Sequence, residues 1–76
     1  MPPNKILAFG PVLRKLRLER NWTQLELGEK LGVAHQHVSL LESSKKFPNL
    51  DMLFKVADAL GVSLTSIAAA MEERLK

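Results

Sequence analysis

The stretch of sequence that decides the fold is Thr23–Lys46, TQLELGEKLGVAHQHVSLLESSKK. Thr23 is a preferred N-cap for a helix, and Glu26 three residues later completes the pattern of a capping box. Gly32 can adopt the left-handed conformation that ends a helix, and a second helical pattern starts directly after it. The sequence therefore predicts two short helices joined by a tight turn, a helix-turn-helix at about residues 24–43.

The second of these helices, expected at about residues 35–43, has two different faces. At 100° per residue, Ala34, Val38 and Leu41 cluster on one side, which we expect to face the protein interior. The opposite side, here named the recognition face, presents His35, Gln36, Ser39 and Leu40. A helix that is buried on one side and polar on the other is typical of the element that enters the major groove of duplex DNA.

A further helix is predicted upstream, from near Leu7–Gly10 to near Arg20. Pro11 must lie in its first turn, because a proline deeper inside would break the helix. Its apolar stripe consists of Phe9, Val12, Leu13 and Leu16.

Two more helices are predicted downstream of the motif. Asn49 can cap the first of them and Gly61 can end it. We expect its buried side to consist of Leu50, Leu53, Phe54, Ala57 and Leu60. Ser63 can cap the last helix, at about residues 64–75, whose stripe consists of Leu64, Ile67, Ala68, Met71 and Leu75. No alternating run is long enough for a strand, so we expect an all-α, five-helix bundle that forms one domain, residues 1–76.

Length and composition limit the other possibilities. The 76 residues are 46% hydrophobic and 25% charged, as in an ordinary small globular domain. There is no cysteine, so neither disulfides nor thiolate metal sites can support the core. The N-terminal apolar run is too short for a secretory segment, and no segment approaches the roughly 18–20 apolar residues of a membrane span. We therefore expect a cytoplasmic protein with no membrane partner.

The net charge of +3 is unevenly distributed along the chain. Residues 1–46 hold eight Lys or Arg and four Asp or Glu, whereas residues 47–76 hold three and four. A basic first part that carries the motif, followed by a nearly neutral last third, favours one side for phosphates and another for packing.

Several separated sequence matches, in order and correctly spaced, make the chain resemble the Cro-type phage-repressor family of helix-turn-helix domains, often called Xre-like. They lie between about Phe9 and Ile67 and read LRKLRLERNWTQ, LGEKLGV, VSLLES, PNL and ADALGVSL. The resemblance implies a five-helix bundle of the lambda-repressor type. It also implies operator binding as a dimer that regulates transcription.

The chain departs from the family pattern at three positions. Gly28 stands where alanine is usual, which predicts a loss of roughly 0.5–1 kcal/mol of helix stability. Ala34 replaces the customary Ser or Thr that caps the second helix of the motif, a loss of about 1 kcal/mol. Ser44 replaces a common glycine, so we expect a slightly strained turn after Glu42.

In the family, positions that match the recognition face touch base edges. Gln36 is the first candidate, because a carboxamide can pair with adenine through two hydrogen bonds. His35 and Ser39 are expected to contact bases beside it. Leu40 leaves two interpretations open, which are contact with a thymine methyl group and packing back against the first helix of the motif.

Five further residues are candidates for contacts with DNA phosphates. Gln24 begins the first helix of the motif, where its amide and the free N–H groups suit a phosphate oxygen. His37 lies on the rim of the recognition face. Lys45 and Lys46 follow the motif and in the family flank the DNA backbone, and Arg14 on the upstream helix is the fifth candidate.

Arg17 and Glu42 occupy family positions that pair between the upstream helix and the end of the motif. We interpret them as a structural salt bridge. Trp22, the only tryptophan, is expected to pack beside the Thr23 cap as a hydrophobic staple.

The last helix is the candidate for self-association. Ile67, Met71 and Leu75 fall on one stripe that extends past the expected end of the core, which favours contact with a second copy. We therefore expect a homodimer on a (pseudo)palindromic operator in double-stranded DNA. The alternative is a protein-interaction adaptor, or an antitoxin, with the same fold and a protein as its main partner.

The sequence gives little support to other functions. It has no cysteine, no tyrosine, no glycine-rich phosphate loop and no evident carboxylate pair, so we expect no enzyme activity. His35 and His37 are two residues apart on a helix and point in nearly opposite directions, so we expect no metal site. No cofactor or small-molecule ligand is indicated.

Overall fold

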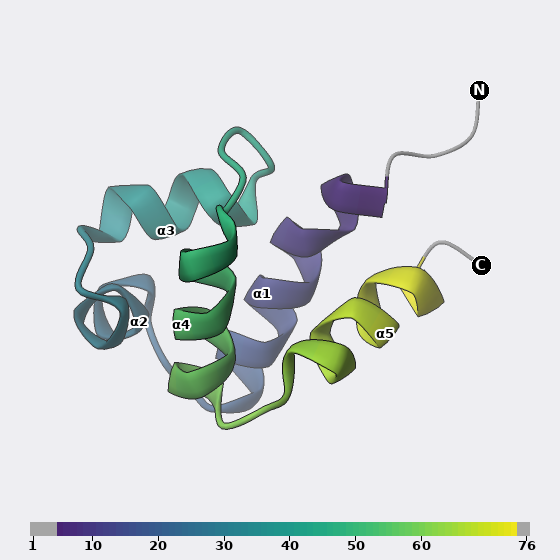
Figure 1. Ribbon diagram of the computed structural model, residues 1–76. Coiled ribbons are helices and arrows are strands. Elements are labelled where there is room, and N and C mark those ends of the chain that lie inside the picture. The colour runs from purple at the N-terminus through teal and green to yellow at the C-terminus, as the bar shows by residue number, and fades with distance from the viewer. Residues whose placement is uncertain (1–4, 75–76) are drawn as a thin grey trace.

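The computed structural model describes residues 5–74, which form one 3-10 turn followed by five α-helices (Figure 1). These elements are η1 Lys5–Ala8, α1 Phe9–Glu19, α2 Gln24–Leu31, α3 His35–Glu42, α4 Leu50–Leu60 and α5 Leu64–Arg74. The predicted all-α, five-helix architecture is confirmed.

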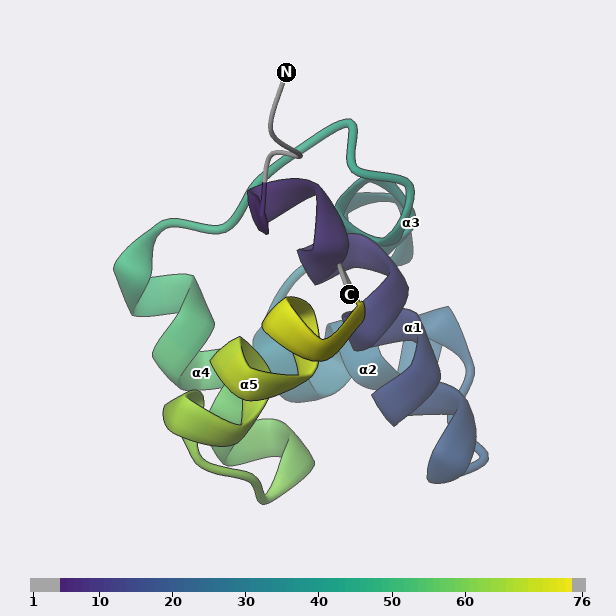
Figure 2. The same cartoon turned by 90° about the vertical axis from the view of Figure 1, so that its right-hand side faces the viewer.

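The helices pack around α1. Helix α1 contacts η1, α3 and α5, while α2 packs against both α3 and α4. Figures 1 and 2 show α2 and α3 on one side of the molecule and α5 on the other. The motif and the last helix are therefore available to different partners.

The helix boundaries follow from the capping residues. The Thr23 hydroxyl accepts from the Glu26 N–H at 3.0 Å, and the Glu26 carboxylate accepts from the Thr23 N–H at 3.0 Å, which completes the predicted capping box. Asn49 caps α4 by accepting from the Met52 N–H at 2.8 Å. Gly32 and Gly61 end α2 and α4 with φ of 73° and 69°, a conformation that glycine adopts without strain.

The core combines side chains from all five helices. Its largest fully buried side chains are Phe9, Leu13, Leu27, Val38, Leu41, Val56 and Ile67. Arg20 fastens α4 to this core, because its guanidinium donates to the Leu60 carbonyl at 2.7 and 3.1 Å and to the Leu16 carbonyl at 2.8 Å. Sequence reasoning did not identify this role of Arg20.

The prediction for α4 was partly wrong. Leu50 and Phe54 are 63% and 52% exposed, although both were expected on the buried side. The buried side consists of Val56, Ala57 and Leu60, with Leu53 half-buried. Helix α4 carries apolar residues on both sides, so periodicity could not identify the inner one. Leu50 and Phe54, one turn apart, form an exposed apolar strip.

Two glycines allow the helices to approach one another closely. A Cβ atom at Gly10 would lie 2.5 Å from the Glu42 carbonyl oxygen and 2.7 Å from that of Leu41, so α1 meets the end of α3 there. At Gly28 a Cβ would lie 2.7 Å from the Val33 carbonyl oxygen. Gly28 therefore allows close packing in the turn. The prediction of a lower helix stability at this position considered helix propensity alone and not this packing.

Among residues 5–74, no single helix is long and apolar enough to cross a membrane. Helices α4 and α5 together have the length and composition for it, but they are bent by 98° relative to each other.

Candidate nucleic-acid interface

Helix α3 has the two faces that its sequence predicts. Val38 and Leu41 are completely buried, while the four residues of the recognition face are exposed. Ala34 was expected on the buried side, but it is exposed, because it precedes the helix as its N-cap. The methyl side chain of Ala34 accepts no hydrogen bond from the first turn of α3, as expected where alanine replaces the usual Ser or Thr.

Leu40 differs from the other apolar residues of α3. It is 36% exposed and is not among the residues that pack against the core. Its backbone holds the following loop, because the Leu40 carbonyl accepts from the N–H groups of Lys45 and Lys46 at 3.0 and 3.1 Å. The outward position of Leu40 is compatible with the contact to a thymine methyl group, which stays a prediction.

The Arg17–Glu42 salt bridge is present and buried. Arg17 Nε donates to Glu42 Oε2 at 2.6 Å and Nη2 donates to Oε1 at 3.0 Å, and the two side chains are 9% and 5% exposed. Arg17 Nη1 also donates to the Trp22 carbonyl at 2.8 Å. The hydrogen bond to Glu42 raises the pKa of Arg17, against the opposing effect of burial, so the guanidinium stays charged. One side chain thus connects α1, the end of α3 and the entry to α2.

Gln24 joins the same network. Its Nε2 donates to Glu42 Oε1 at 3.2 Å, and the residue is half-buried at the first position of α2. A carboxamide has two N–H donors, so this bond leaves one of them for another acceptor. The sequence did not predict the contact with Glu42.

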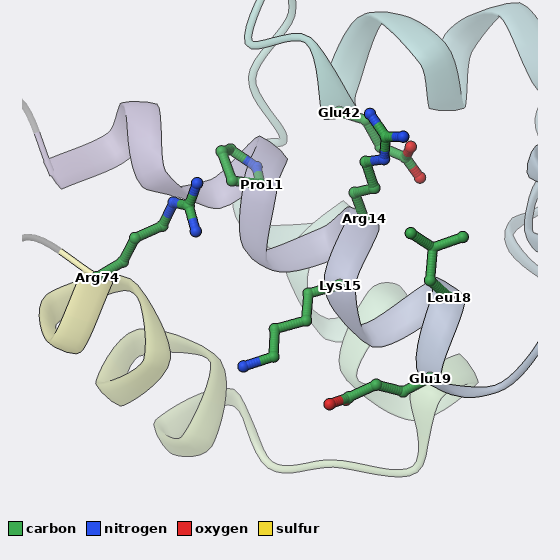
Figure 3. A pocket seen from close by; sticks show the side chains of 7 residues that line it. All are labelled: Pro11, Arg14, Lys15, Leu18, Glu19, Glu42 and Arg74. Carbon is green, nitrogen blue, oxygen red and sulfur yellow. The ribbon is translucent and has the colours of Figure 1, made fainter.

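The lysine and arginine candidates lie around the C-terminal end of α3. Lys45 and Lys46 are exposed in the loop that follows the helix. Arg14 is exposed on α1 and extends toward the end of α3 at Glu42 (Figure 3). His37 is half-buried and borders a small hollow together with Lys46.

The open groove drawn in Figure 3 lies between α1 and the end of α5 and has a mixed lining. Its residues are Pro11, Arg14, Lys15, Leu18, Glu19, Glu42 and Arg74. Lys15, a weaker phosphate candidate beside Arg14 in the sequence, and Arg74, which the sequence did not indicate, add positive charge to the groove.

The turn after α3 has the predicted strain. Ser44 has a φ of 62°, which a residue other than glycine rarely adopts. Its hydroxyl donates to the Leu7 carbonyl at 3.1 Å, which fixes the turn against η1. Trp22 is half-buried against the core, and Lys30 Nζ lies 4.5 Å from the centre of its ring.

The predicted dimer stripe requires a correction. Ile67 is only 2% exposed and belongs to the core, because α5 turns this residue toward the inside of the bundle. Met71 is half-buried, and Leu75 lies outside the described residues. Nearby, an apolar groove of about 300 Å³ lies between η1, α4 and α5. It is lined by Ile6, Phe9, Pro48, Leu53, Leu64, Ile67, Ala68 and Met71.

Within residues 5–74, no group of three or more His, Asp or Glu side chains is arranged to hold a metal ion.

Helices α2 and α3 form a tight motif within the bundle, and the outer face of α3 is exposed. This arrangement defines a helix-turn-helix protein. The model of the helix-turn-helix family matches residues 13–67, and the chain belongs to this family, as its resemblance to the Xre-like domains indicated. Members of the family are DNA-binding regulators of transcription.

Three similar proteins illustrate this membership. An uncharacterised HTH-type transcriptional regulator of Methanocaldococcus jannaschii is 38% identical over 55 residues, which are 72% of this chain and 83% of that protein. The immunity repressor protein of Bacillus phage phi105 is 31% identical over 61 residues, 80% of this chain but only 42% of the repressor. The clp gene regulator ClgR of Corynebacterium glutamicum has a TM-score of 0.89 at 28% identity, covering 97% of this chain and 96% of that one.

Proposed function

We propose that the protein binds a (pseudo)palindromic operator in double-stranded DNA as a homodimer and regulates transcription in the cytoplasm. The observation that carries the proposal is the exposed recognition face of α3, a helix that packs on the core through Val38 and Leu41 and is followed by Lys45 and Lys46. Glu42, the only carboxylate of α3, is buried against Arg17, so the helix presents no negative charge to a phosphate backbone.

The residues around α3 would have two different tasks. His35, Gln36, Ser39 and Leu40 face outward and would contact base edges in the major groove. Gln24, His37, Lys45, Lys46 and Arg14 would contact phosphates and fix the register of the helix on the duplex. Gln24 would use the N–H that its bond to Glu42 leaves available.

Homodimerisation would use the apolar groove between α4 and α5 and the exposed strip beside it. Met71 lines this groove. The groove residues Pro48 and Leu53 have large exposed hydrophobic residues close to them in the sequence, which are Phe47, Leu50 and Phe54. A surface of this kind favours contact between two copies. In a twofold dimer the two α3 helices would enter successive major grooves, about 34 Å or 10–10.5 base pairs apart.

Selection of binding sites from a random duplex pool, followed by titration of the best site at several salt concentrations, tests the proposal. Only contacts from Lys and Arg release counterions, and about two or three of these per protomer, four to six per dimer, imply a slope of log K against log salt of roughly −4 to −5. Enrichment of a symmetric sequence with such a slope supports operator binding. An affinity that is flat between about 50 and 200 mM salt, or a pool without enrichment, contradicts it.

A protein-interaction adaptor, or an antitoxin that binds a partner protein, is the second candidate function. The exposed Phe54 and Leu50 favour it, because an outer apolar strip could hold another protein as well as a second copy. Retention of a protein partner by a variant that binds no DNA would favour this alternative over the regulator.

A further inference from the structure

His37 lines a hollow of about 190 Å³ between α3 and the start of α4. The other residues of the lining are Lys46, Phe47, Pro48, Asn49 and Met52. The imidazole is half-buried, while Lys46 is exposed. Asn49 is the N-cap of α4 and Met52 lies in its first turn, so the positive end of this helix borders the hollow as well. A histidine, a lysine and a helix N-terminus thus meet at one place that suits a phosphate.

Among residues 5–74, no carboxylate lines this hollow, and no charged residue of α1 or α2 belongs to its lining. On α4, Asp51 lies outside the lining, and its carboxylate is 3.4 Å from Lys55 Nζ. On α3, Glu42 is bound to Arg17. A proton on His37 would therefore gain an opposite charge when a phosphate enters the hollow.

Histidine differs from lysine in the conditions under which it is charged. An imidazole changes its charge between about pH 5 and 8, whereas a lysine side chain stays charged throughout this range. A DNA phosphate is negative at all these pH values, so it attracts the protonated imidazole more strongly than the neutral one. A phosphate contact through histidine is therefore coupled to the uptake of a proton from the solvent.

We infer that DNA binding by this protein is linked to pH through His37, which takes up a proton as a backbone phosphate enters the hollow beside Lys46. This inference rests on the proposed binding of duplex DNA and adds a regulation of that binding. The affinity rises as the pH falls from about 8 to about 6, because the lower pH supplies the charged imidazole. Lys46 is the permanent cation of the contact, and His37 is the pH-dependent one.

The test measures duplex binding by the full chain at pH 8 and pH 6 and at equal ionic strength. It uses the enriched site and a scrambled duplex, because a phosphate contact does not depend on sequence. Two unit charges about 4 Å apart in water attract by about 1 kcal/mol, which is about fivefold in affinity for each protomer. A dimer should therefore bind about 25-fold more tightly at pH 6. Because a charged imidazole also releases a counterion, the slope of log K against log salt should become steeper by roughly 2 per dimer.

Three variants assign the effect to a residue. His37→Gln keeps a polar side chain that does not titrate, so it should bind like the wild type at pH 8 and lose the gain at pH 6. Lys46→Gln should lower the affinity about equally at both pH values, because lysine is charged at both. His35→Gln is the matched control, since His35 is the other histidine of α3 and points in nearly the opposite direction, toward base edges without a net charge. It should keep the gain.

Two further measurements guard against a change in folding. Circular dichroism melts show whether each variant is folded at both pH values. The NMR signal of the His37 ring, followed against pH in the wild type, requires no variant. It should stay at its protonated position up to a higher pH in the presence of duplex than in its absence.

The possible results separate this inference from the function on which it depends. Equal affinity at pH 6 and pH 8, a gain that His37→Gln retains, or a His37 ring signal that titrates identically with and without duplex would each overturn the inference alone. A protein that binds no duplex at either pH would overturn the proposed function, and the inference with it.

Discussion

Replacing Arg17 with alanine is expected to destabilise the fold severely. The substitution removes two hydrogen bonds to Glu42 and one to the Trp22 carbonyl, and it leaves a carboxylate that is 5% exposed without its counter-ion. Removing one partner of a buried pair costs roughly 3–5 kcal/mol. Gln24 still donates to Glu42 at 3.2 Å and offsets part of this loss, so we expect about 3 kcal/mol.

This loss is large for a chain of this length. A domain of 76 residues has a free energy of unfolding of roughly 4–11 kcal/mol, at about 0.05–0.15 kcal/mol per residue. Each kcal/mol shifts the melting temperature of such a domain by about 4–8 °C, so Arg17→Ala should melt roughly 12–24 °C lower. Circular dichroism at 222 nm and the fluorescence of Trp22, the only tryptophan, both report this transition.

Two variants separate the buried pair from a general effect of lost charge. Arg14→Ala removes an arginine from the exposed side of the same helix, and its stability should stay within about 0.5 kcal/mol of the wild type. Arg17→Met combined with Glu42→Leu removes both charges and should recover most of the stability that Arg17→Ala loses. Equal melting temperatures for Arg17→Ala and Arg14→Ala would refute the assignment of the pair as the connection between α1 and α3.

Three further predictions concern binding, association and packing. Gln36→Ala should relax the sequence preference, whereas Lys46→Ala should weaken binding to all duplexes alike. Lys46→Ala should also reduce the salt slope by about one for each lost phosphate contact. If both variants behave identically in binding assays on matched and scrambled duplexes, the assigned roles are wrong. Phe54→Glu should shift the protein toward monomer in sedimentation experiments at tens of micromolar protein. Leu25→Glu, at a leucine of similar exposure on α2, should not. A wild-type protein that is monomeric at this concentration would contradict the dimer proposal. Gly10→Ala should lower the free energy of unfolding by about 1–3 kcal/mol in urea titrations, because its Cβ would meet the Glu42 carbonyl at 2.5 Å; unchanged stability would contradict the close approach of α1 and α3.

Local chemistry made the helix boundaries predictable. Thr23, Gly32, Asn49 and Gly61 act within a few residues of themselves, through a side-chain cap or a left-handed backbone, and the structure confirms each of them as a cap. The inner and outer sides of α3 were predictable for a similar reason, because Val38 and Leu41 share one side of this helix while the other side is polar except for Leu40.

Tertiary packing limited the remaining predictions. Helix α4 is apolar on two sides, and only contact with α2 and α5 decides that Val56 is buried and Phe54 is not. Ile67 was placed on the outside for the same reason, since a stripe on a helix does not indicate where the bundle ends. The bond from Gln24 to Glu42 joins residues 18 positions apart, and neither side chain carries a local signal for it.

The Arg17–Glu42 pair also determines the charge of the surface on which DNA binding is proposed. If Glu42 were exposed, its carboxylate would stand a few residues from Lys45 and Lys46 and would reduce their attraction for phosphates. Arg17 binds that carboxylate inside the protein, and neither lysine takes part in an ion pair within residues 5–74. The interaction that holds α3 in place therefore also leaves its flanking cations available. Because Arg17 and Glu42 neutralise each other, the net charge of +3 is carried by other residues, Lys45 and Lys46 among them.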